Sequence, residues 1–299
     1  MKPYLFVPGK YKKPSLVSPE GRMTYFHKSH KIKDPTCLPS RAILCFWDGL
    51  ARSLKKRKDF QKSLSVHETG GLHVDLYRTG QENAPSKLRS SSGRSLQKRQ
   101  NSNPISIYKP QSAAQSASVA VVSRFGIGAP AGVVCLENLR AYGVKEFISV
   151  GLVGSLNSNL KLGSKVLIKK SFRGEGCSYH YRAPFPYVEM SESEERGMYL
   201  KLIKELKLKP VVSWTTDAPF RETKEEVLYF QSKGVECVEM EASALMAVGE
   251  YYGVSVFCLG VVSDHLSPEA WTPGFFDPSV KKSLSELLNK ILFLYTDFV

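Results

Sequence analysis

Three carboxylates stand where strands are expected to end, and they are the residues of this chain best placed to do chemistry. Glu239 and Glu241 lie where a strand turns into a helix, and Asp264 follows the next apolar run, residues 255–262. A hydrophobic core excludes unpaired carboxylates, whereas ligands bind at the carboxyl ends of strands in open α/β sheets. A helix start that carries Glu to suit the helix dipole explains one of these acids. It does not explain the acid after the next strand, so we predict a ligand site here.

Two glycine-rich segments are further candidates for binding. One apolar run leads into Phe-Gly-Ile-Gly-Ala-Pro at residues 125–130, and another leads into Gly-Leu-Val-Gly at residues 151–154. We expect both segments to be turns, and helical spacing over residues 131–142 follows the first. Glycine in such a turn lets backbone N–H groups approach an anion at a helix N-terminus. Tight connections also use glycine for geometry alone, and the residues do not separate the two roles.

Two later segments are rich in aromatic and hydrogen-bonding side chains. Residues 174–181 read Gly-Glu-Gly-Cys-Ser-Tyr-His-Tyr, and residues 215–223 read Thr-Thr-Asp-Ala-Pro-Phe-Arg-Glu-Thr. Tyr and His combine a flat face with a polar tip, which suits the wall of a ligand site. Aromatic packing alone would also account for the first segment.

The order of the expected elements indicates an α/β fold. Apolar strand-like runs alternate with segments of helical spacing, and the glycine turns between them are typical of βαβ units. We therefore predict a single α/β domain with a twisted, mostly parallel (mixed) central sheet flanked by helices. Strands are expected at residues 40–46, 72–77, 105–108, 119–122, 146–150, 165–169, 211–215 and 255–262, and helices at residues 50–60, 131–142, 191–206, 224–234 and 279–298.

The positive charge of the chain is concentrated in its first third. The 299 residues carry a net charge of +14, and the first 110 residues hold all of the excess. Residues 84–104 are rich in Ser, Gln, Lys and Arg, so we interpret them as a basic low-complexity insertion in a domain of residues 40–299. Residues 1–39 are expected to form an N-terminal arm on the body or on a neighbouring subunit. Nucleic acid binding through the basic third is an alternative, but the insertion lacks aromatic residues for base stacking, so a solvated loop is favoured.

Cysteine usage and hydropathy favour a reducing compartment. Six cysteines are scattered without a C-x-x-C pair or a histidine spacing typical of zinc sites, so we expect free thiols and no metal. No run reaches the roughly 18 apolar residues of a membrane span, and no signal-peptide core opens the chain. We therefore expect a cytoplasmic protein.

Seven segments, taken in order, resemble the purine nucleoside and uridine phosphorylase superfamily, and its archaeal and bacterial branch most closely. Each is a weak pattern alone, but together, over residues 119–276, they are specific. The segments are residues 125–130, 151–156, 175–181, 214–223, 238–245, 263–264 and 271–275. The resemblance implies a nucleoside phosphorylase, an α/β enzyme of dimers or hexamers. Such an enzyme uses phosphate to release a free base and ribose 1-phosphate, without a metal or an organic cofactor.

The resemblance also assigns roles to the residues that match the family's motifs. Met240 and Glu241 match the positions that hold the ribose, where two carboxylate oxygens accept hydrogen bonds from two ring hydroxyls, and Glu239 matches a neighbouring acid. Asp264 matches the acid that protonates N7 of a leaving purine, which requires a raised pKa. The expected contacts to the base are Phe220, Tyr179, His180 and Asp217, and those to phosphate are Gly126, Gly128, Gly151, Arg221 and Arg41.

The sequence departs from the family pattern at the expected phosphate site. Ser149 and Leu152 stand where well-studied members carry an Arg and a Ser or Thr that bind phosphate. Related nucleosidases lack that arginine and use water as the nucleophile, so hydrolysis of the same bond is the first alternative. A nucleoside-binding or nucleic-acid-associated homologue without phosphate chemistry is the second. The resemblance favours purines, because the Gln-x-Arg pair by which uridine phosphorylases recognise uracil is missing after Asp217.

Overall fold

The computed structural model of the chain describes residues 9–29, 38–47, 49, 65–67, 73–78, 118–190 and 196–296. The helix expected at residues 50–60, the strand expected at 105–108 and the basic insertion at 84–104 lie outside the described residues. None of the described helices is long and apolar enough to cross a membrane. The same residues contain no group of three or more His, Cys, Asp or Glu side chains that could hold a metal ion.

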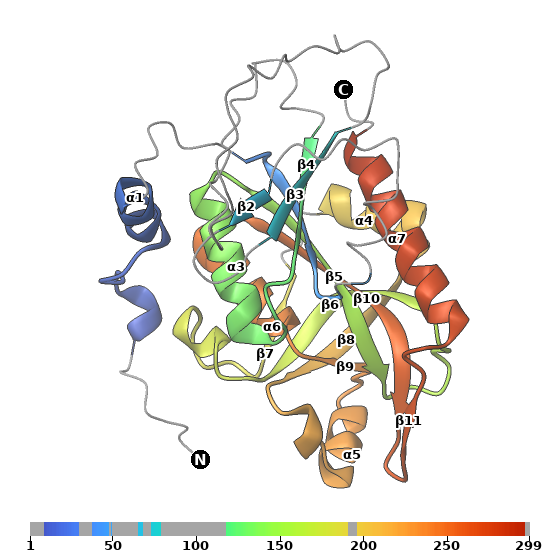
Figure 1. Cartoon of the computed structure of the whole chain (residues 1–299). Coiled ribbons are helices and arrows are strands. Elements are labelled where there is room, and N and C mark those ends of the chain that lie inside the picture. Colours follow the sequence, from blue (N-terminus) through green and yellow to red (C-terminus); the bar gives the residue numbers. More distant parts are fainter. Residues whose placement is uncertain are drawn as a thin grey trace, which may run out of the picture.

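One mixed sheet forms the centre of the described part of the chain (Figure 1). Its strands are β1 (Arg41–Cys45), β2 (Ser65–His67), β3 (His73–Arg78), β4 (Ser118–Ser123), β5 (Glu146–Ser155), β6 (Lys165–Gly174), β7 (Tyr187–Glu189), β8 (Lys209–Thr216), β9 (Cys237–Glu239), β10 (Ser255–Leu266) and β11 (Trp271–Pro273). The strand order is β11-β10-β6-β8-β9-β5-β1-β4-β3-β2, and β7 pairs with β6. Strand β10 also pairs with β5, so β10, β6, β8, β9 and β5 form a closed ring.

Parallel and antiparallel pairs both occur in this sheet. Strand β5 lies parallel to β1 and to β10, and β8 lies parallel to β6 and to β9. Strand β10 is antiparallel to β6 and β11, and β5 is antiparallel to β9. The α/β architecture with a mixed central sheet is therefore confirmed, and the parallel pair between β10 and β5 closes the ring.

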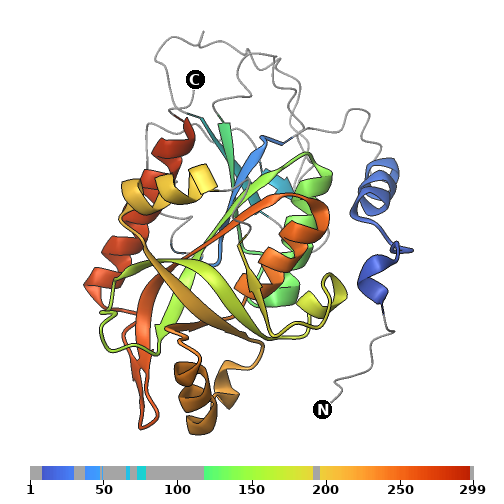
Figure 2. The same ribbon diagram turned by 180° about the vertical axis from the view of Figure 1, so that it is seen from behind.

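Helices cover both faces of the sheet (Figures 1 and 2). They are α1 (Pro19–Ser29), α3 (Ala129–Ala141), α4 (Arg196–Leu206), α5 (Lys224–Ser232), α6 (Ala242–Tyr252) and α7 (Pro278–Thr296), with the short 3-10 helices η1 (Lys10–Lys12), η2 (Ser178–His180) and η3 (Pro219–Arg221). Successive residues of a strand point to opposite faces. Ala42 and Leu44 accordingly join a buried cluster with α3 and α6, whereas Ile43 and Cys45 join a second cluster with α4 and α7.

The prediction of a turn at residues 151–154 is wrong. Strand β5 runs without interruption over Glu146–Ser155, because it pairs with β10 as far as its last residue and with β9 at Gly154. Glycine serves close packing here, since a Cβ atom at Gly154 would lie 3.0 Å from Asp264 Oδ2 and 3.0 Å from Val238 Cγ1. Strand β5 extends beyond the expected end at residue 150, because its backbone pairing with β10 and β9 continues there.

The described part of the N-terminal arm lies on the body of the molecule. Helix α1 packs beside α3, where Glu20 forms an ion pair with Arg140 (Figure 1). The 3-10 helix η1 approaches η2, and Lys10 contacts the imidazole of His180. The described part of the arm therefore covers the outer side of α3 (Figure 1).

Candidate functional site

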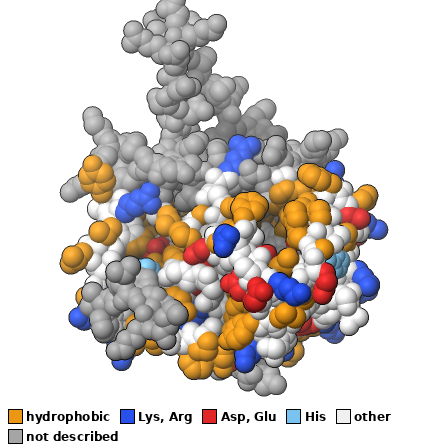
Figure 3. Space-filling model, turned by 90° about the horizontal axis from the view of Figure 1, so that it is seen from below, with side chains coloured by type: hydrophobic (Ala, Val, Ile, Leu, Met, Phe, Trp, Pro, Cys, Tyr) orange, Lys and Arg blue, Asp and Glu red, His pale blue; other side chains and the backbone are white. Residues whose placement is uncertain are grey.

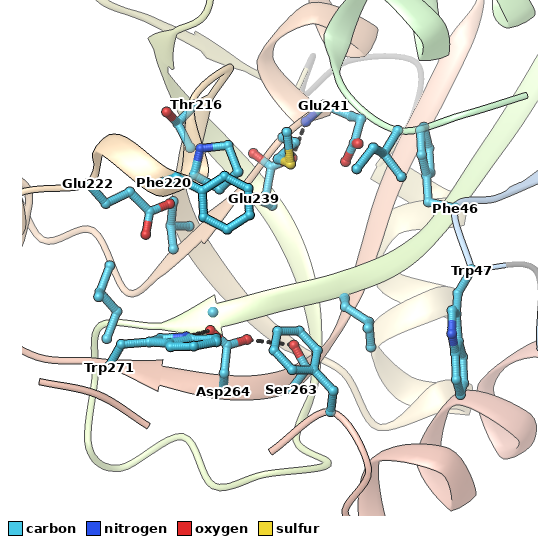
Figure 4. Close-up of a pocket in the computed structure, with 18 residues that line it drawn as sticks. Phe46, Trp47, Thr216, Phe220, Glu222, Glu239, Glu241, Ser263, Asp264 and Trp271 are labelled. Atoms are coloured by element: carbon cyan, nitrogen blue, oxygen red, sulfur yellow. Dashed lines mark hydrogen bonds between the residues drawn. The ribbon is translucent and has the colours of Figure 1, made fainter. Parts of the chain in front are cut away.

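A pocket of about 710 Å³ lies at the carboxyl ends of β1, β5, β8, β9 and β10 (Figure 4). This is the edge at which the sequence predicts a ligand site. Its lining residues are Phe46, Trp47, Ile127, Leu152, Gly154, Thr216, Pro219, Phe220, Glu222, Val238, Glu239, Met240, Glu241, Ser263, Asp264, Leu266, Trp271 and Phe275. Apolar and aromatic side chains form most of the wall, four carboxylates project from it, and none of the described lining residues is Lys, Arg or His.

The aromatic wall is partly open to solvent. Phe220 is 97% exposed and Trp271 is 56% exposed, although both line the pocket. Strand β11, which carries Trp271, lies at the lower end of Figure 1, the side from which Figure 3 is seen. On that face hydrophobic side chains are widespread and acidic side chains lie among them. The pocket therefore offers flat apolar surfaces beside negative charge, a combination that suits an aromatic ligand with hydrogen-bond donors.

Glu241 begins helix α6 and is held in place by the first glycine turn. Gly128, with a φ of 90°, directs its backbone N–H to Glu241 Oε1 at 2.6 Å. Burial raises the pKa of Glu241 to about 8, and the nearby charge of Glu239 adds to the effect. The backbone N–H groups of Gly128 and Met240 oppose this shift, and the carboxylate lines the pocket, where a ligand can reach it.

Both carboxylate oxygens of Glu239 accept hydrogen bonds from the protein itself. Its Oε1 atom accepts hydrogen bonds from the hydroxyls of Thr215 and Ser213, and Oε2 accepts from the backbone N–H groups of Glu241 and Ala242 at 2.7 and 2.6 Å. Burial raises the pKa of Glu239 while these donors oppose the shift. The carboxylate satisfies the free N–H groups of the α6 N-terminus. Glu239 thus positions Glu241, which leaves Glu241 to meet a ligand.

Asp264 is oriented by donors on both of its oxygens. Ser263 Oγ donates to Oδ1 at 2.6 Å, and the indole Nε1 of Trp271 donates to Oδ2 at 2.8 Å. Asp264 lies within β10 at a register shift after Val262, and not beyond the end of the strand. Two donors at fixed positions hold the carboxyl plane in one orientation, and Figure 4 shows it below Glu239 in the same cavity.

Five of the site residues expected from the sequence line this pocket together. They are Glu239, Met240, Glu241, Asp264 and Phe220. Met240 also approaches the glycine turn, since a Cβ atom at Gly128 would lie 3.9 Å from its methyl group. Of the two glycines expected to bind phosphate in this turn, Gly128 gives its N–H to Glu241, and Gly126 has a φ of 98° that favours glycine.

The segment of residues 174–181 is placed beside the pocket and not in its wall. Tyr179 lies under the guanidinium of Arg173, which is 3.9 Å from the ring centroid. Asp217 Oδ2 accepts a hydrogen bond from the Gly176 backbone N–H at 2.9 Å. Burial, together with the charge of Lys10, lowers the pKa of His180. In this arrangement Tyr179, His180 and Asp217 brace the loop.

The arginines expected near phosphate are likewise outside the described wall. Arg41 stands at the amino end of β1, where its guanidinium contacts the carbonyl of Tyr295 at 3.4 Å and pairs with Glu146 at 3.9 Å. Arg221 ends η3 and is exposed. Gly151 is an interior residue of β5 beside Phe46.

The two positions at which the sequence departs from the expected phosphate site differ in their surroundings. Ser149 is buried in β5 between β1 and β10, whereas Leu152 lines the pocket. An apolar side chain therefore occupies the wall at residue 152, where a hydroxyl donor would bind an anion better.

A family model described as the phosphorylase superfamily matches residues 96–292 of the sequence. The chain belongs to the phosphorylase superfamily. The predicted resemblance to purine nucleoside and uridine phosphorylases is thereby confirmed.

Curated relatives of this superfamily member are distant. An uncharacterised protein of Acanthamoeba polyphaga mimivirus is 31% identical over 175 residues, which cover 55% of this chain and 68% of the viral protein. A guanosine phosphorylase of Halorubrum lacusprofundi is 26% identical over 162 residues, 53% of this chain and 66% of the relative. A DeoD-type purine nucleoside phosphorylase of Clostridium novyi is 26% identical over 144 residues, 47% of this chain and 62% of the relative. The match thus spans slightly less than two thirds of these two phosphorylases.

Solved structures share the fold of this phosphorylase-superfamily chain. Purine nucleoside phosphorylase from Toxoplasma gondii, solved with immucillin-H, superposes with a TM-score of 0.61 and 15% identity, covering 87% of this chain and 92% of the other. Uridine phosphorylase from Vibrio fischeri superposes with a TM-score of 0.54 and 20% identity, with the same coverage. At these identities the likeness concerns the fold alone.

Sequence reasoning missed Glu222 and Trp271 as members of the pocket. Glu222 follows η3, and burial followed by the charge of Asp264 raises its pKa to about 7. Trp271, in the short strand β11, orients Asp264 through its indole N–H. Both residues belong to segments that carry the resemblance, but only their tertiary relation to Asp264 distinguishes them from the other polar residues there.

Proposed function

We propose that this chain cleaves the N-glycosidic bond of a purine nucleoside and transfers the ribose to phosphate. One observation carries the proposal: a single pocket contains Glu241, whose carboxylate is held by the glycine turn, and Asp264, with its carboxyl oriented by two donors. Membership of the phosphorylase superfamily supports phosphate as the acceptor. The printed names of the relatives, guanosine phosphorylase and purine nucleoside phosphorylase, support a purine.

In the proposed reaction Glu241 accepts hydrogen bonds from the ribose hydroxyls, and Asp264 faces N7 of the base. A phosphate oxygen attacks C1′ while the bond from C1′ to N9 breaks and its electron pair moves into the purine ring. Asp264 gives its proton to N7, so the base leaves without a full negative charge. Glu239 acts through Glu241, whose backbone N–H it holds.

Phosphate dependence tests the proposal directly. Inosine, guanosine and adenosine are incubated with the full chain, with and without phosphate, and the free base and sugar product are separated by chromatography. We expect ribose 1-phosphate, formed only with phosphate. The substitutions E241A and D264N should each lower kcat/KM by roughly 10²- to 10⁴-fold, the range for a lost proton donor or transition-state contact. Activity unchanged in both variants would refute the catalytic assignment, and the exposed-residue variant E269Q serves as the control.

Hydrolysis is the second candidate, and one observation favours it. No Lys, Arg or His is among the described residues that line the pocket, whereas four carboxylates are. A phosphate dianion needs several charge-assisted donors, while a water molecule does not. If hydrolysis is the reaction, base release proceeds equally fast without phosphate and the sugar product is free ribose.

A further inference from the structure

The carboxylates of the pocket differ in how many of their oxygens are already bonded. Glu239 and Asp264 accept hydrogen bonds from the protein on both oxygens. Glu241 accepts one from Gly128 on Oε1, and the backbone N–H of Met240 also acts on its carboxylate. For Glu222 no described residue supplies a hydrogen bond or an ion pair to either oxygen, although its side chain lines the pocket. A half-buried carboxyl without a partner lowers the stability of the fold unless a ligand or a water molecule forms hydrogen bonds with it. Glu222 is therefore the lining acid with the largest unused capacity for hydrogen bonds.

Glu222 lies at the end of the pocket that is opposite Glu241, so it would meet the opposite end of a ligand. In Figure 4 Glu222 and Glu241 lie on opposite sides of the pocket, with Asp264 below and between them. The charge of Asp264 acts on Glu222, whereas the charge that acts on Glu241 comes from Glu239. A nucleoside that spans the pocket with its ribose at Glu241 and N7 at Asp264 directs the rest of its base toward Glu222.

We propose that Glu222 determines base specificity, by reading the C6 substituent and N1 of a purine whose N7 lies at Asp264. This rests on the proposed function. In a purine ring the C6 substituent adjoins N7, and N1 adjoins C6, so a group next to the N7 partner meets these two positions. Phe220, two residues earlier in the chain, offers its exposed ring as a neighbouring flat surface.

The protonation state of Glu222 then selects among bases. A neutral carboxyl has one donor and one acceptor, which match O6 and N1–H of inosine and guanosine or N1 and N6–H of adenosine. An ionised carboxylate has acceptors only, which match N1–H and N2–H of guanosine and repel O6. Burial first, then the charges of Asp264 on β10 and Glu226 on α5, raises the pKa of Glu222 to about 7. Below about pH 7 the neutral carboxyl thus suits all three nucleosides, and above it guanosine gains relative to inosine and adenosine through its additional N2–H donor.

The test measures kcat/KM for inosine, adenosine and guanosine between pH 5.5 and 8.5 in the full chain and in E222Q and E222L. For the wild type we expect the guanosine-to-inosine ratio to rise roughly tenfold across this range. Gln keeps one donor and one acceptor, so E222Q should retain inosine cleavage within about threefold and show a ratio that does not change with pH. E222L should lose roughly 10- to 100-fold for all three nucleosides and much less for purine riboside, which lacks a C6 substituent.

A matched control lies on the same segment. Glu225 is exposed at the start of α5, outside the pocket, so E225Q should behave as the wild type. Ratios in E222Q and E222L that equal the wild-type ratios at every pH overturn the role of Glu222, while losses in E241A and D264N still uphold the proposed function. If the wild type cleaves no nucleoside, equilibrium dialysis with hypoxanthine and guanine decides: equal affinity in wild type and E222L, or no binding, overturns the inference.

Discussion

Replacing Glu241 by Gln should stabilise the protein at alkaline pH and leave its stability nearly unchanged at acidic pH. Burial, followed by the charge of Glu239, raises the pKa of Glu241 from 4.5 to about 8. The folded chain therefore binds more protons than the unfolded chain between these values, and its stability falls as the pH rises through them. Gln carries no charge, and its oxygen can still accept the Gly128 N–H.

The size of the effect follows from the pKa shift. A shift from 4.5 to about 8 has an upper limit of about 5 kcal/mol, at roughly 1.4 kcal/mol for each pKa unit. Glu241 lines an open pocket and keeps partial contact with solvent, which screens its charge. We therefore expect E241Q to exceed the wild type by about 2 kcal/mol near pH 9 and by about 0 near pH 5.

Urea unfolding at pH 5, 7 and 9, followed by fluorescence and circular dichroism, measures this difference in the free energy of unfolding. The variant E269Q, which changes an exposed glutamate outside the pocket, is the matched control and should show no trend with pH. A difference between E241Q and the wild type that is the same at all three pH values would refute the reasoning. In that case the carboxylate of Glu241 is not desolvated by this fold.

Three further substitutions test the surroundings of Glu239 and Asp264. Thr215→Val removes a buried hydroxyl that donates to Glu239, and unfolding in urea should show a loss of about 2 kcal/mol. Gly154→Ala places a Cβ 3.0 Å from Asp264 Oδ2, so we expect a loss of about 1 to 3 kcal/mol and a lower kcat in the nucleoside assay. Trp271→Phe keeps an aromatic ring and removes the donor to Asp264, so kcat should fall roughly tenfold with little change in KM.

Each of these substitutions has a control elsewhere in the chain. Thr272→Val changes an exposed threonine, and Phe276→Leu changes a 99% exposed aromatic residue outside the pocket wall. Gly197→Ala adds a Cβ that meets nothing within 4 Å and should leave stability equal or slightly higher. A Gly154→Ala protein as stable and active as Gly197→Ala would show that β5 and β10 are not closely packed at this point. A wild-type kcat in Trp271→Phe would show that the hydrogen bond from the indole to Asp264 does not contribute to catalysis.

Local patterns in the sequence predicted most of the described elements. The apolar run over residues 119–122 and the helical spacing over 131–142 became β4 and α3, because both elements bury a face whose periodicity is visible in the residues. The glycines at 151–154 misled, since glycine permits close approach between strands as readily as it permits a turn. The closing pair between β10 and β5 joins strands far apart in sequence, and no local pattern records such a contact.

The same distinction holds within the site. Glu239, Glu241 and Asp264 were predictable because acids at strand ends conflict with core burial. Glu222 was not, because an acid in a polar loop after η3 conflicts with nothing locally. Its environment is created by Asp264 on β10, a strand that follows later in the chain.

The four acids of the pocket differ in how many hydrogen bonds the protein donates to their carboxylates. This difference indicates which donors the ligand must supply. Glu239 and Asp264 have donors on both oxygens, so the orientation of each carboxyl is fixed before any ligand enters. Glu222 accepts no hydrogen bond from the described residues, and Glu241 accepts only from backbone N–H groups. Their pKa values are raised to about 7 and about 8, because burial and neighbouring carboxylates disfavour the charged form. A ligand with hydroxyl donors at one end and a base edge at the other satisfies both carboxyls at once. An anion such as phosphate can bind in this pocket only while Glu241 and Glu222 are protonated, or where residues beyond the described wall contribute positive charge.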